Sequence, residues 1–257
     1  MVNVLIVGAT GDLGTALVNR YAQTGKKVYA TYLNGKPDKD PPKNVEYIPE
    51  IDVTQPNAAG TISLKFLDTR IDLLVICTGV FYTETLDALN WENELRMYKV
   101  NAMGPLFLIK SLRAFPHLIE DNVTKIVLLS GEVGSIALRA DAASGGNYGG
   151  HASKAALNMV GKLLSIDMKP KGIPVVLVHT GYLTKTLPDG SKNLCKDHPD
   201  SIGAREAAEA LYNWIDMELD MTKTGQLWAI RGTAGIRTAA AVLGQVDEPQ
   251  APRQLPW

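Results

Sequence analysis

Three glycines near the N-terminus have the spacing of a loop that binds phosphate groups. Gly8, Gly11 and Gly14 follow the apolar run Val4–Val7 and lead into Leu13–Tyr21, where apolar residues recur at helical spacing. Glycines at such a turn let the backbone approach a pyrophosphate closely, and the N-terminus of the next helix supplies free N–H groups and a positive dipole end. The alternative is a simple tight turn. Because the pattern follows the first strand of an alternating chain, it favours a dinucleotide site.

The residues after the second expected strand bear on which dinucleotide is bound. NAD sites have an acidic residue about 20 residues after the glycines, at the end of that strand, for the ribose 2′-hydroxyl. The chain there reads Thr31-Tyr32-Leu33-Asn34, with neither an acid nor an arginine. This favours NADP(H) over NAD. Lys36 is within reach of a 2′-phosphate, although a solvated loop lysine is the more ordinary interpretation.

Short apolar runs alternate with amphipathic stretches along the chain, and this alternation sets the expected fold. The expected strands are Val4–Val7, Val28–Tyr32, Val45–Ile48, Ile71–Cys77, Ile126–Ser130, Ile173–Val178 and Gln226–Ile230. The expected helices are Leu13–Tyr21, one containing Ile62–Leu67, Trp91–Leu112, His151–Met168 and Ala204–Leu219. Strands that are apolar on both faces need helices on both sides. The pattern therefore predicts one α/β domain over residues 1–257, a doubly wound (Rossmann) parallel sheet with helices on both faces.

Four other segments have the composition of irregular chain. Asn34–Asn44 is polar and rich in proline and glycine, and Ala137–Gly150 is rich in alanine, glycine and serine. Gly181–Asp200 follows an expected strand, and a substrate loop is expected over residues 181–203. Gln245–Trp257 is expected to be an irregular tail.

Composition and charge argue against several classes of partner. Of the 257 residues 46% are hydrophobic, and 26 basic residues against 27 acidic ones give a net charge of −1. Neither nucleic acid nor a membrane surface is therefore expected as a partner, and no apolar run reaches the length of about 18 residues that predicts a transmembrane helix. Cys77 and Cys195 lack metal-site spacing, so no metal is expected. A reduced, cytoplasmic protein is the simplest interpretation.

Several later motifs stand in the order of one known family. They are Asp52-Val53, Cys77-Thr78-Gly79, Asn101 within Lys99–Pro105, Lys154 within Ser153–Met159, and His179-Thr180-Gly181-Tyr182. In these motifs essentially the whole chain resembles the short-chain dehydrogenase/reductase family. Gly134-Ser135-Ile136 after the fifth strand and the final Pro256-Trp257 are similar to its C-factor-like subgroup.

The resemblance implies a set of cofactor-binding residues. Lys154 would bond the nicotinamide ribose, and Asp52 with Val53 would contact adenine. Asp12 departs from the family, because it stands where classical members have their middle glycine, and a carboxylate near a pyrophosphate must point away or weaken its binding. Gly11 makes the spacing closer to extended or atypical members. The residues implied for NADP(H) binding are Gly8, Thr10, Asp12, Leu13, Gly14, Tyr32, Asp52, Val53, Thr78, Gly79, Asn101, Lys154, Gly181, Tyr182 and Thr184.

Two glycines stand where the family has catalytic side chains. Gly150 is four residues before Lys154, at the family's tyrosine position, and Gly131 is three residues before Gly134, at the family's serine position. On a helix the i,i+4 spacing puts tyrosine and lysine on one face, where the lysine cation lowers the phenol pKa. The phenol then exchanges a proton near neutrality. Of the Asn-Ser-Tyr-Lys set, Asn101 and Lys154 remain as candidate catalytic residues.

Three other side chains are candidates for the missing acid. Tyr148 would swing into the vacant position if the glycines at 149–150 make the chain flexible; a plain loop tyrosine is an equal alternative. His151 shares a helix face with Lys154, and a histidine there would serve as a general acid near pH 7, although the family directs this position elsewhere, which favours a structural role. His179 stands at the carboxyl end of the sixth strand, where ligands of such sheets bind. A core or capping histidine is its alternative.

Three charged residues lie in or near the loop after the fifth strand. Glu132, Arg139 and Asp141 would supply charge or a proton at the same sheet edge. Solvated loop charges are the default interpretation for each.

Three functions fit these residues. The first is an NADP(H)-dependent reductase with an atypical active site, acting on a carbonyl, enone or iminium of a bulky secondary-metabolite intermediate. The second is a cyclase, isomerase or dehydratase that keeps a cofactor without turning it over, in a pocket enlarged by the two glycines. The third is a non-catalytic nucleotide-binding protein. Under each, the resemblance implies a small-molecule partner and a homodimer or homotetramer formed through the helices around 91–115 and 151–168.

Overall fold

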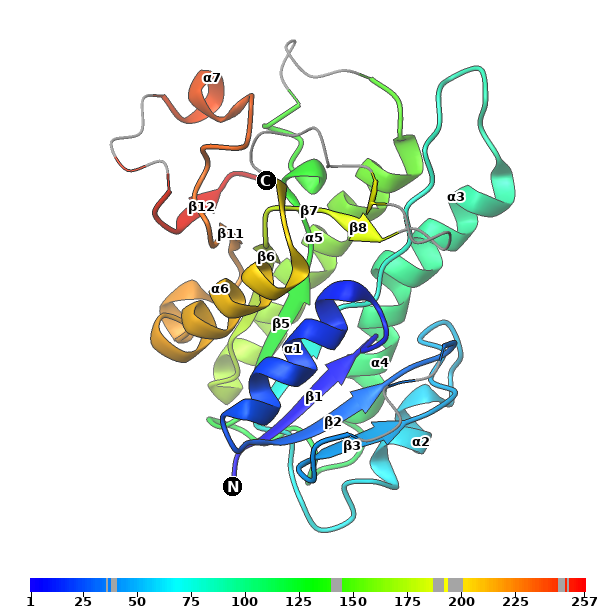
Figure 1. Ribbon diagram of the computed structural model, residues 1–257, viewed down its shortest axis with the longest axis vertical. Coiled ribbons are helices and arrows are strands. Elements are labelled where there is room, and N and C mark those ends of the chain that lie inside the picture. The colour runs from blue at the N-terminus through cyan, green and yellow to red at the C-terminus, as the bar shows by residue number, and fades with distance from the viewer. Residues whose placement is uncertain are drawn as a thin grey trace.

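A central sheet organises the computed structural model, which describes residues 1–35, 37, 41–139, 145–186, 192–193, 201–244, 248 and 250–257. Within these residues eight strands pair in the order β12-β11-β6-β5-β4-β1-β2-β3 (Figure 1). Their bounds are β1 Asn3–Val7, β2 Lys27–Thr31, β3 Val45–Ile48, β4 Leu73–Ile76, β5 Lys125–Leu129, β6 Val175–His179, β11 Leu227–Ala229 and β12 Arg253–Leu255. Neighbouring strands are parallel, apart from the antiparallel pair of β11 and β12. The expected doubly wound fold is confirmed.

Helices and two small two-stranded sheets complete the described chain. The helices are α1 Asp12–Gln23, α2 Ala58–Ser63, α3 Trp91–Tyr98, the π-helical turn η1 Lys99–Met103, α4 Gly104–Leu112, the 3₁₀ turn η2 Glu132–Gly134, α5 Tyr148–Met168, the 3₁₀ turns η3 Lys169–Lys171 and η4 Met221–Lys223, α6 Ala204–Met217 and α7 Ala239–Leu243. The small sheets pair β7 Tyr182–Leu183 with β10 Ser201–Ile202, and β8 Lys185–Thr186 with β9 Lys192–Asn193. Among these helices, none is both long and apolar enough to cross a membrane.

Alternate residues of the central strands enter two separate cores, one on each face of the sheet. In β1, Val4 and Ile6 pack into one core, and Leu5 and Val7 pack into the other. This follows from the two-residue period of a strand, and it requires helices on both sides. α1 and α6 cover the first core and lie in front of the sheet in Figure 1. α2, α4 and α5 contribute to the second core.

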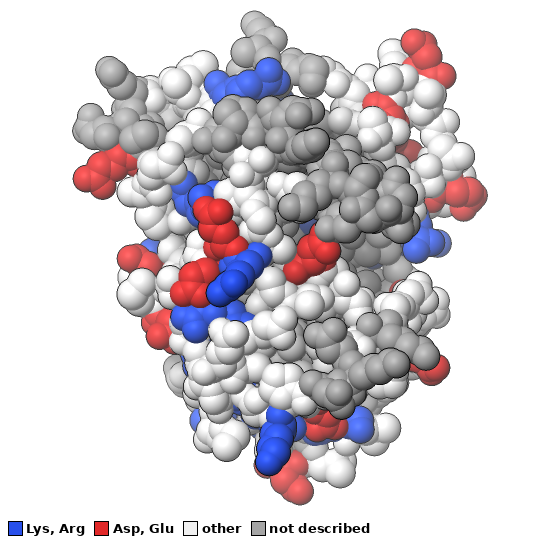
Figure 2. Space-filling view, in the orientation of Figure 1, with Lys and Arg blue, Asp and Glu red and all other residues white. Residues whose placement is uncertain are grey.

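Basic and acidic side chains are interspersed on the face that carries α1 and α6, as Figure 2 shows. Ion pairs join α1 and the turn that follows it to α6 there. Arg20 of α1 pairs with Glu209 of α6 at 2.5 Å, and Lys26 pairs with Asp216 at 3.1 Å. Because opposite charges alternate, this face does not present one continuous patch of a single sign.

The end of the chain is not irregular, which corrects the expectation for Gln245–Trp257. Arg253–Leu255 forms β12, and Leu255 is 1% exposed within the core. The N–H of Ala137 donates to the carbonyl oxygen of Trp257 at 2.9 Å, which ties the C-terminal residue to the loop after β5. A three-residue strand with one buried apolar side chain is too short to show an alternating pattern, so the sequence did not indicate it.

Two helix ends also differ from the expectation. α5 begins at Tyr148 rather than at His151, so the end of the loop expected over Ala137–Gly150 is helical. α2 ends at Ser63, and the stretch from there to Leu67 is not helical. Glycine pairs and short apolar runs weaken local helical signals, and tertiary packing decides such ends.

Replacing the buried side chain of β12 tests whether this strand belongs to the core. Leu255→Ala should lower the free energy of unfolding by about 2–5 kcal/mol, because it removes a buried leucine and leaves a cavity. Urea denaturation measures this. Gln254→Ala, at an exposed position of the same strand, should change it by no more than about 0.5 kcal/mol. Equal effects of the two substitutions would contradict the placement of Leu255.

Candidate functional site

Two close approaches of the backbone shape the loop after β1. Gly8 has a φ of +88°, and a side chain there would press against Thr78, in the segment after β4. A side chain on Gly14, in the first turn of α1, would overlap the carbonyl oxygen of Gly8. Gly11 precedes α1 and provides no side-chain cap, so the first amides of the helix are left for another acceptor. Such amides suit a phosphate group.

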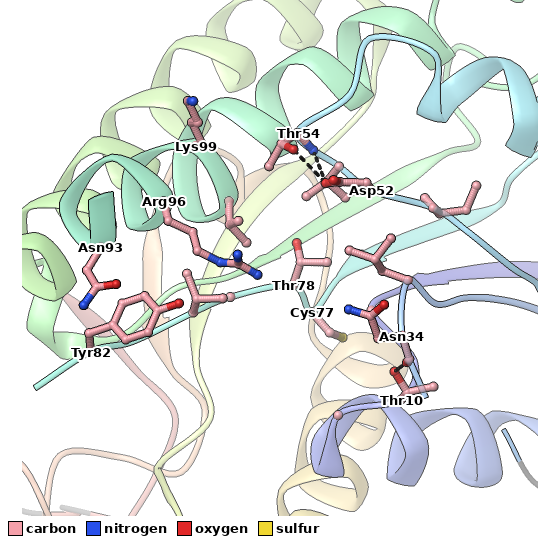
Figure 3. Close-up of a pocket in the computed structure, with 18 of the residues that line it drawn as sticks. Thr10, Asn34, Asp52, Thr54, Cys77, Thr78, Tyr82, Asn93, Arg96 and Lys99 are labelled. Carbon is pink, nitrogen blue, oxygen red and sulfur yellow. Dashed lines mark hydrogen bonds between the residues drawn. The ribbon is translucent and has the colours of Figure 1, made fainter. Parts of the chain in front are cut away.

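A groove crosses the carboxyl edge of the sheet beside this loop. It consists of two cavities, of about 680 Å³ and about 550 Å³, which share Gly8, Thr10, Gly11 and the segment Cys77–Val80. The first, larger cavity extends between the segments after β2 and β3 and the helix α3 (Figure 3). The second cavity extends to β5, α5 and the segment after β6. β1 pairs with β2 on one side and β4 on the other, and doubly wound sheets open a crevice at such a switch point.

Most of the residues predicted to bind a dinucleotide line this groove. The first cavity is lined by Gly8, Thr10, Asp52, Val53, Thr78 and Gly79, and the second adds Asp12, Leu13, Gly14, Asn101, Lys154, Gly181, Tyr182 and Thr184. Tyr32 is not among the lining residues, and its ring packs edge-on against Tyr47 with 6.2 Å between centroids. Lys36 and Asp141, two further sequence candidates, lie outside the described residues.

Polar side chains in the first cavity fit a bound dinucleotide. Thr78 Oγ1 is buried and has no hydrogen-bond partner among the described residues. A buried hydroxyl without a partner is costly, so a ligand that bonds it there is favoured. Asp52 Oδ1 accepts from the N–H of Thr54 at 2.9 Å and from its hydroxyl at 2.8 Å, which fixes the carboxylate at the cavity wall (Figure 3).

Asn101 lies in the π-helical turn η1, where the long helix expected over Trp91–Leu112 is locally widened. Its side chain is 1% exposed. Its Oδ1 accepts from the N–H of Val80 at 2.8 Å, and its Nδ2 donates to the carbonyl oxygen of Val80 and to Ser153 Oγ, both at 2.9 Å. The residue therefore holds the segment after β4 against α5. Widened turns of this kind recur at functional sites.

Lys154 reaches the second cavity from α5, one helical turn after Gly150. Its Nζ donates to the carbonyl oxygen of Leu129, at the end of β5, at 2.6 Å. A Cβ atom on Gly79 would lie 3.7 Å from this Nζ and 3.6 Å from Asn101 Oδ1. The ammonium group and the amide therefore both lie beside Gly79, where a Cβ atom would make ordinary contacts with them.

The space beside Gly150 is filled, which corrects two expectations about the glycine pair. A side chain on Gly150 would overlap the ring of Phe81, and one on Gly149 would overlap Met97 and the carboxylate of Glu94. Both glycines lie in the first turn of α5 and are buried. They therefore make the helix pack closely and do not make the chain flexible. Gly150 does not enlarge the cavity either, because Phe81 lines it in that place.

Gly131 differs from Gly150 in this respect. A Cβ atom there would lie 3.4 Å from Val133 Cγ2 and 3.9 Å from His179 Nδ1, which are ordinary contacts. Its φ of −172° is open to any residue. The cavity is therefore roomier at Gly131, and this part of the expected enlargement is consistent with the structure.

The three candidates for the missing acid occupy different environments. Tyr148 is the first residue of α5, is 42% exposed and lines neither cavity. His151 also lines neither cavity, and its Nδ1 lies 3.1 Å from the carbonyl oxygen of Gly146. His179 does line the second cavity, and it is 8% exposed. Burial, aided by the charge of Arg231, lowers its pKa to about 4, so its imidazole is neutral near pH 7.

A buried carboxylate forms the far wall of the second cavity. Glu132 is 4% exposed; its Oε1 accepts from the hydroxyl of Tyr182 at 3.0 Å, and its Oε2 pairs with Arg139 at 2.5 Å. The ring of Tyr182 also meets that of His179 edge-on, 5.4 Å between centroids. A buried charge needs such partners. Glu132 is therefore not the solvated loop charge that the default interpretation made it, and it positions Tyr182. Arg139 is an exposed loop residue, as expected, and it pairs with Glu132.

Sequence reasoning missed Phe81, Ser153 and Arg96. Ser153 adjoins Lys154 in the motif, which is a signal that was available. Phe81 follows Cys77-Thr78-Gly79 by two residues, but its contact with Gly150 forms only when the segment after β4 packs against α5. Arg96 stands on a predicted helix with no motif around it, so the sequence offered no signal for its place in the first cavity.

Comparison with known proteins adds independent evidence. Residues 2–193 match the family model described as short chain dehydrogenase. The chain is 28% identical over 221 residues to 1-hydroxy-2-glutathionyl-2-methyl-3-butene dehydrogenase of Rhodococcus sp. (strain AD45), over 84% of this chain and 91% of that protein. It is 30% identical over 133 residues to C-signal of Myxococcus xanthus, over 51% of this chain and 76% of that protein.

Solved structures share the fold at lower identity. The NADPH-bound carbonyl reductase from chicken fatty liver superposes with a TM-score of 0.75 at 21% identity, over 89% of this chain and 91% of that one. A carbonyl reductase from Pseudomonas aeruginosa PAO1 gives a TM-score of 0.74 at 21% identity, with both chains fully covered. At these identities the likeness concerns the fold alone.

The buried neutral imidazole of His179 predicts a pH dependence of stability. The pKa is about 4 in the folded protein against 6.5 for an unperturbed histidine. Protonation therefore favours the unfolded chain, and the stability linked to His179 is present above pH 6.5 and is lost as the pH falls towards 4. Between pH 7.5 and pH 5 the wild type should lose about 2 kcal/mol more than His179→Gln, measured by urea denaturation. His117→Gln, at an exposed position, should keep the wild-type profile; parallel profiles for His179→Gln and the wild type would refute the assignment.

Proposed function

The chain belongs to the short chain dehydrogenase family, and from this premise we propose that it is an NADP(H)-dependent reductase with an atypical active site. Its substrate is a bulky small molecule that carries a carbonyl, enone or iminium group. The observation that carries the proposal is the continuous groove that runs from the glycine loop to Lys154 and Asn101. It passes Thr78 Oγ1, which has no hydrogen-bond partner within the described part of the chain. A carbonyl reductase of similar fold is NADPH-bound, which supports the choice of cofactor.

The lining residues divide into groups that suit the parts of NADP(H). The amides after Gly11 suit the pyrophosphate, and Asp52 with Val53 suits the adenosine end of the first cavity. Lys154 suits the nicotinamide ribose, and the segment from Gly181 suits the nicotinamide amide. Thr31–Asn34 carries no acid to oppose a 2′-phosphate. When bound, NADPH supplies the hydride.

The side chains of the second cavity position the substrate, and those that the structure describes include no strong proton donor for it. The ammonium of Lys154 is held by the carbonyl oxygen of Leu129, which fixes where its charge lies. His179 is neutral, and the hydroxyl of Tyr182 is directed to Glu132. We take Gly131 and Gly150 to occupy the positions of the family's serine and tyrosine. A substrate that needs little proton donation, an activated enone or an iminium, therefore fits this site best.

A non-redox reaction is the second candidate, and Phe81 is the observation that favours it. The ring of Phe81 lines the second cavity where the family has a polar side chain. An aromatic face stabilises positive charge in a bound molecule. A cyclase, isomerase or dehydratase that retains NADP(H) without turnover would use such a surface.

Cofactor binding and turnover test the proposed function together. Purified protein should bind NADPH more tightly than NADH, and should consume it when enones, cyclic imines and ketones are supplied. Absorbance of the reduced nicotinamide follows turnover, and chromatography follows the products. Lys154→Ala should weaken NADPH binding about 10-fold or more, because it removes a charged hydrogen-bond donor. Lys162→Ala, at an exposed position of the same helix, should leave binding unchanged.

Each alternative has its own outcome in that experiment. Product formation without NADPH consumption would replace the reductase by the non-redox candidate. Binding of NADPH without any product from a broad substrate panel would favour a nucleotide-binding protein without catalysis. Failure to bind either nucleotide would refute the cofactor assignment.

We also propose self-association into a homodimer or homotetramer through α4 and α5. Both helices pack on the sheet through one face and expose apolar side chains on the other. These are Met103, immediately before α4, and Phe107, Met159, Leu163 and Ile166, each between 49% and 60% exposed. Apolar clusters of this kind mark interfaces, and a second copy of the chain presents a matching face.

A charged residue on that face should disrupt the assembly. Leu163→Glu should shift the protein to a smaller species in light scattering coupled to size-exclusion chromatography, because an interface buries this position and desolvates the new carboxylate. Lys169→Glu, at the exposed end of α5, should leave the mass unchanged. A monomeric wild type would contradict the proposal.

A further inference from the structure

An arginine of α3 points into the first cavity, as Figure 3 shows. α3 begins after Asn90, whose side chain accepts from the N–H of Asn93 at 2.9 Å. Asn93, Arg96 and Val100 follow one another at spacings of three and four residues, so they share one helix face. All three line the cavity. The helix cap therefore helps to fix the face from which Arg96 projects.

The guanidinium of Arg96 has no ion pair or hydrogen bond with the side chains that the structure describes. Several other arginines in the described chain do have one. Arg20 pairs with Glu209, Arg70 with Asp72, and Arg139 with Glu132. Asp52 and Glu92 also line this cavity, but neither forms an ion pair with Arg96 in the described structure, so the guanidinium is available for a ligand that occupies the cavity.

Another part of the cavity wall is partly apolar. It is made by Ile51 and Val53, which are 4% and 6% exposed, and by Asn34. The hydroxyl of Thr10 donates to the carbonyl oxygen of Asn34 at 3.1 Å, which joins this wall to the glycine loop (Figure 3). A cavity lined by an apolar surface and a planar cation suits an aromatic base.

Two parts of the cofactor are possible partners for Arg96, the adenine base and the 2′-phosphate, and the position of Arg96 favours the base. In doubly wound sheets the ribose 2′ position lies at the end of the second strand, which here is the side of Thr31 and Asn34. Arg96 approaches from α3, on the other side of the cavity. The adenine base is the part of the cofactor between these two sides.

We propose that Arg96 binds the adenine base of the cofactor through its planar guanidinium, and that it thereby sets the affinity for the adenosine end. The inference rests on the proposed cofactor function. Guanidinium groups stack on aromatic planes in a way that the compact ammonium of lysine does not reproduce. A lysine at position 96 would keep the charge and lose the plane.

Binding measurements with three ligands test this assignment. Dissociation constants for NADPH, NADH and ADP-ribose would be measured by calorimetry with wild type, Arg96→Ala and Arg96→Lys. All three ligands contain adenine, and NADPH alone carries the 2′-phosphate. Arg96→Ala should weaken all three by a similar factor of about 10, which corresponds to about 1.4 kcal/mol. Arg96→Lys should resemble Arg96→Ala rather than the wild type.

Controls separate this effect from folding and from general charge. Arg237→Ala removes an exposed arginine that lines neither cavity and should leave all three constants unchanged. Thermal unfolding should be the same for each variant, since Arg96 is exposed.

Several outcomes would overturn the inference. Weakening confined to NADPH would assign Arg96 to the 2′-phosphate, and full recovery in Arg96→Lys would reduce its role to charge. Unchanged constants in Arg96→Ala would remove any role. A wild type that binds none of the three ligands would instead refute the proposed function on which the inference depends.

Discussion

The close contact between the Gly8 loop, α1 and the segment after β4 is the constraint on which the groove depends. The carbonyl oxygen of Gly8 occupies the place where residue 14 would carry a side chain, and Thr78, in the segment after β4, occupies the place where residue 8 would carry one. Only residues without a Cβ atom allow the turn to be this tight. The tight turn brings the start of α1 to the edge of the sheet, and the two cavities open on either side of it. The order β4-β1-β2 makes this the point where the chain's connections diverge.

A second set of interactions, hydrogen bonds made by Asn101 and Lys154, fixes the residues of the second cavity relative to this turn. Asn101 joins the backbone of Val80 to Ser153, and Lys154 joins α5 to the end of β5. These bonds lie in or beside the core, where losing one partner leaves the other unsatisfied. The segment after β4, the widened turn η1 and α5 are therefore fixed relative to one another. Lys154 is accordingly held in place before any ligand enters.

Sequence patterns predicted the parts of the molecule that depend on local periodicity. Buried strands such as Val4–Val7 and helices such as α1 and α6 were found because two-residue and 3.6-residue periods are visible in short windows. β12 was missed because three residues carry no period. The extent of the domain over residues 1–257 stays a prediction. At the site, the glycine loop was identified from its spacing and Lys154 from the resemblance of its segment to the family, whereas the pairing of Glu132 with Tyr182 joins residues 50 positions apart. Contacts of that kind are decided by tertiary packing and leave no local signal.

The contact between Phe81 and Gly150 shows that this site differs from the family's active site by more than the loss of one side chain. A tyrosine placed at position 150 would overlap the ring of Phe81, so that substitution alone does not restore the family's geometry. Phe81 would have to move or become smaller at the same time. Gly149 is similarly enclosed by Met97 and Glu94, which leaves the first turn of α5 little freedom to rearrange. The chemistry of this chain must therefore be explained with an apolar ring, a neutral histidine and a fixed lysine in the positions that they now occupy.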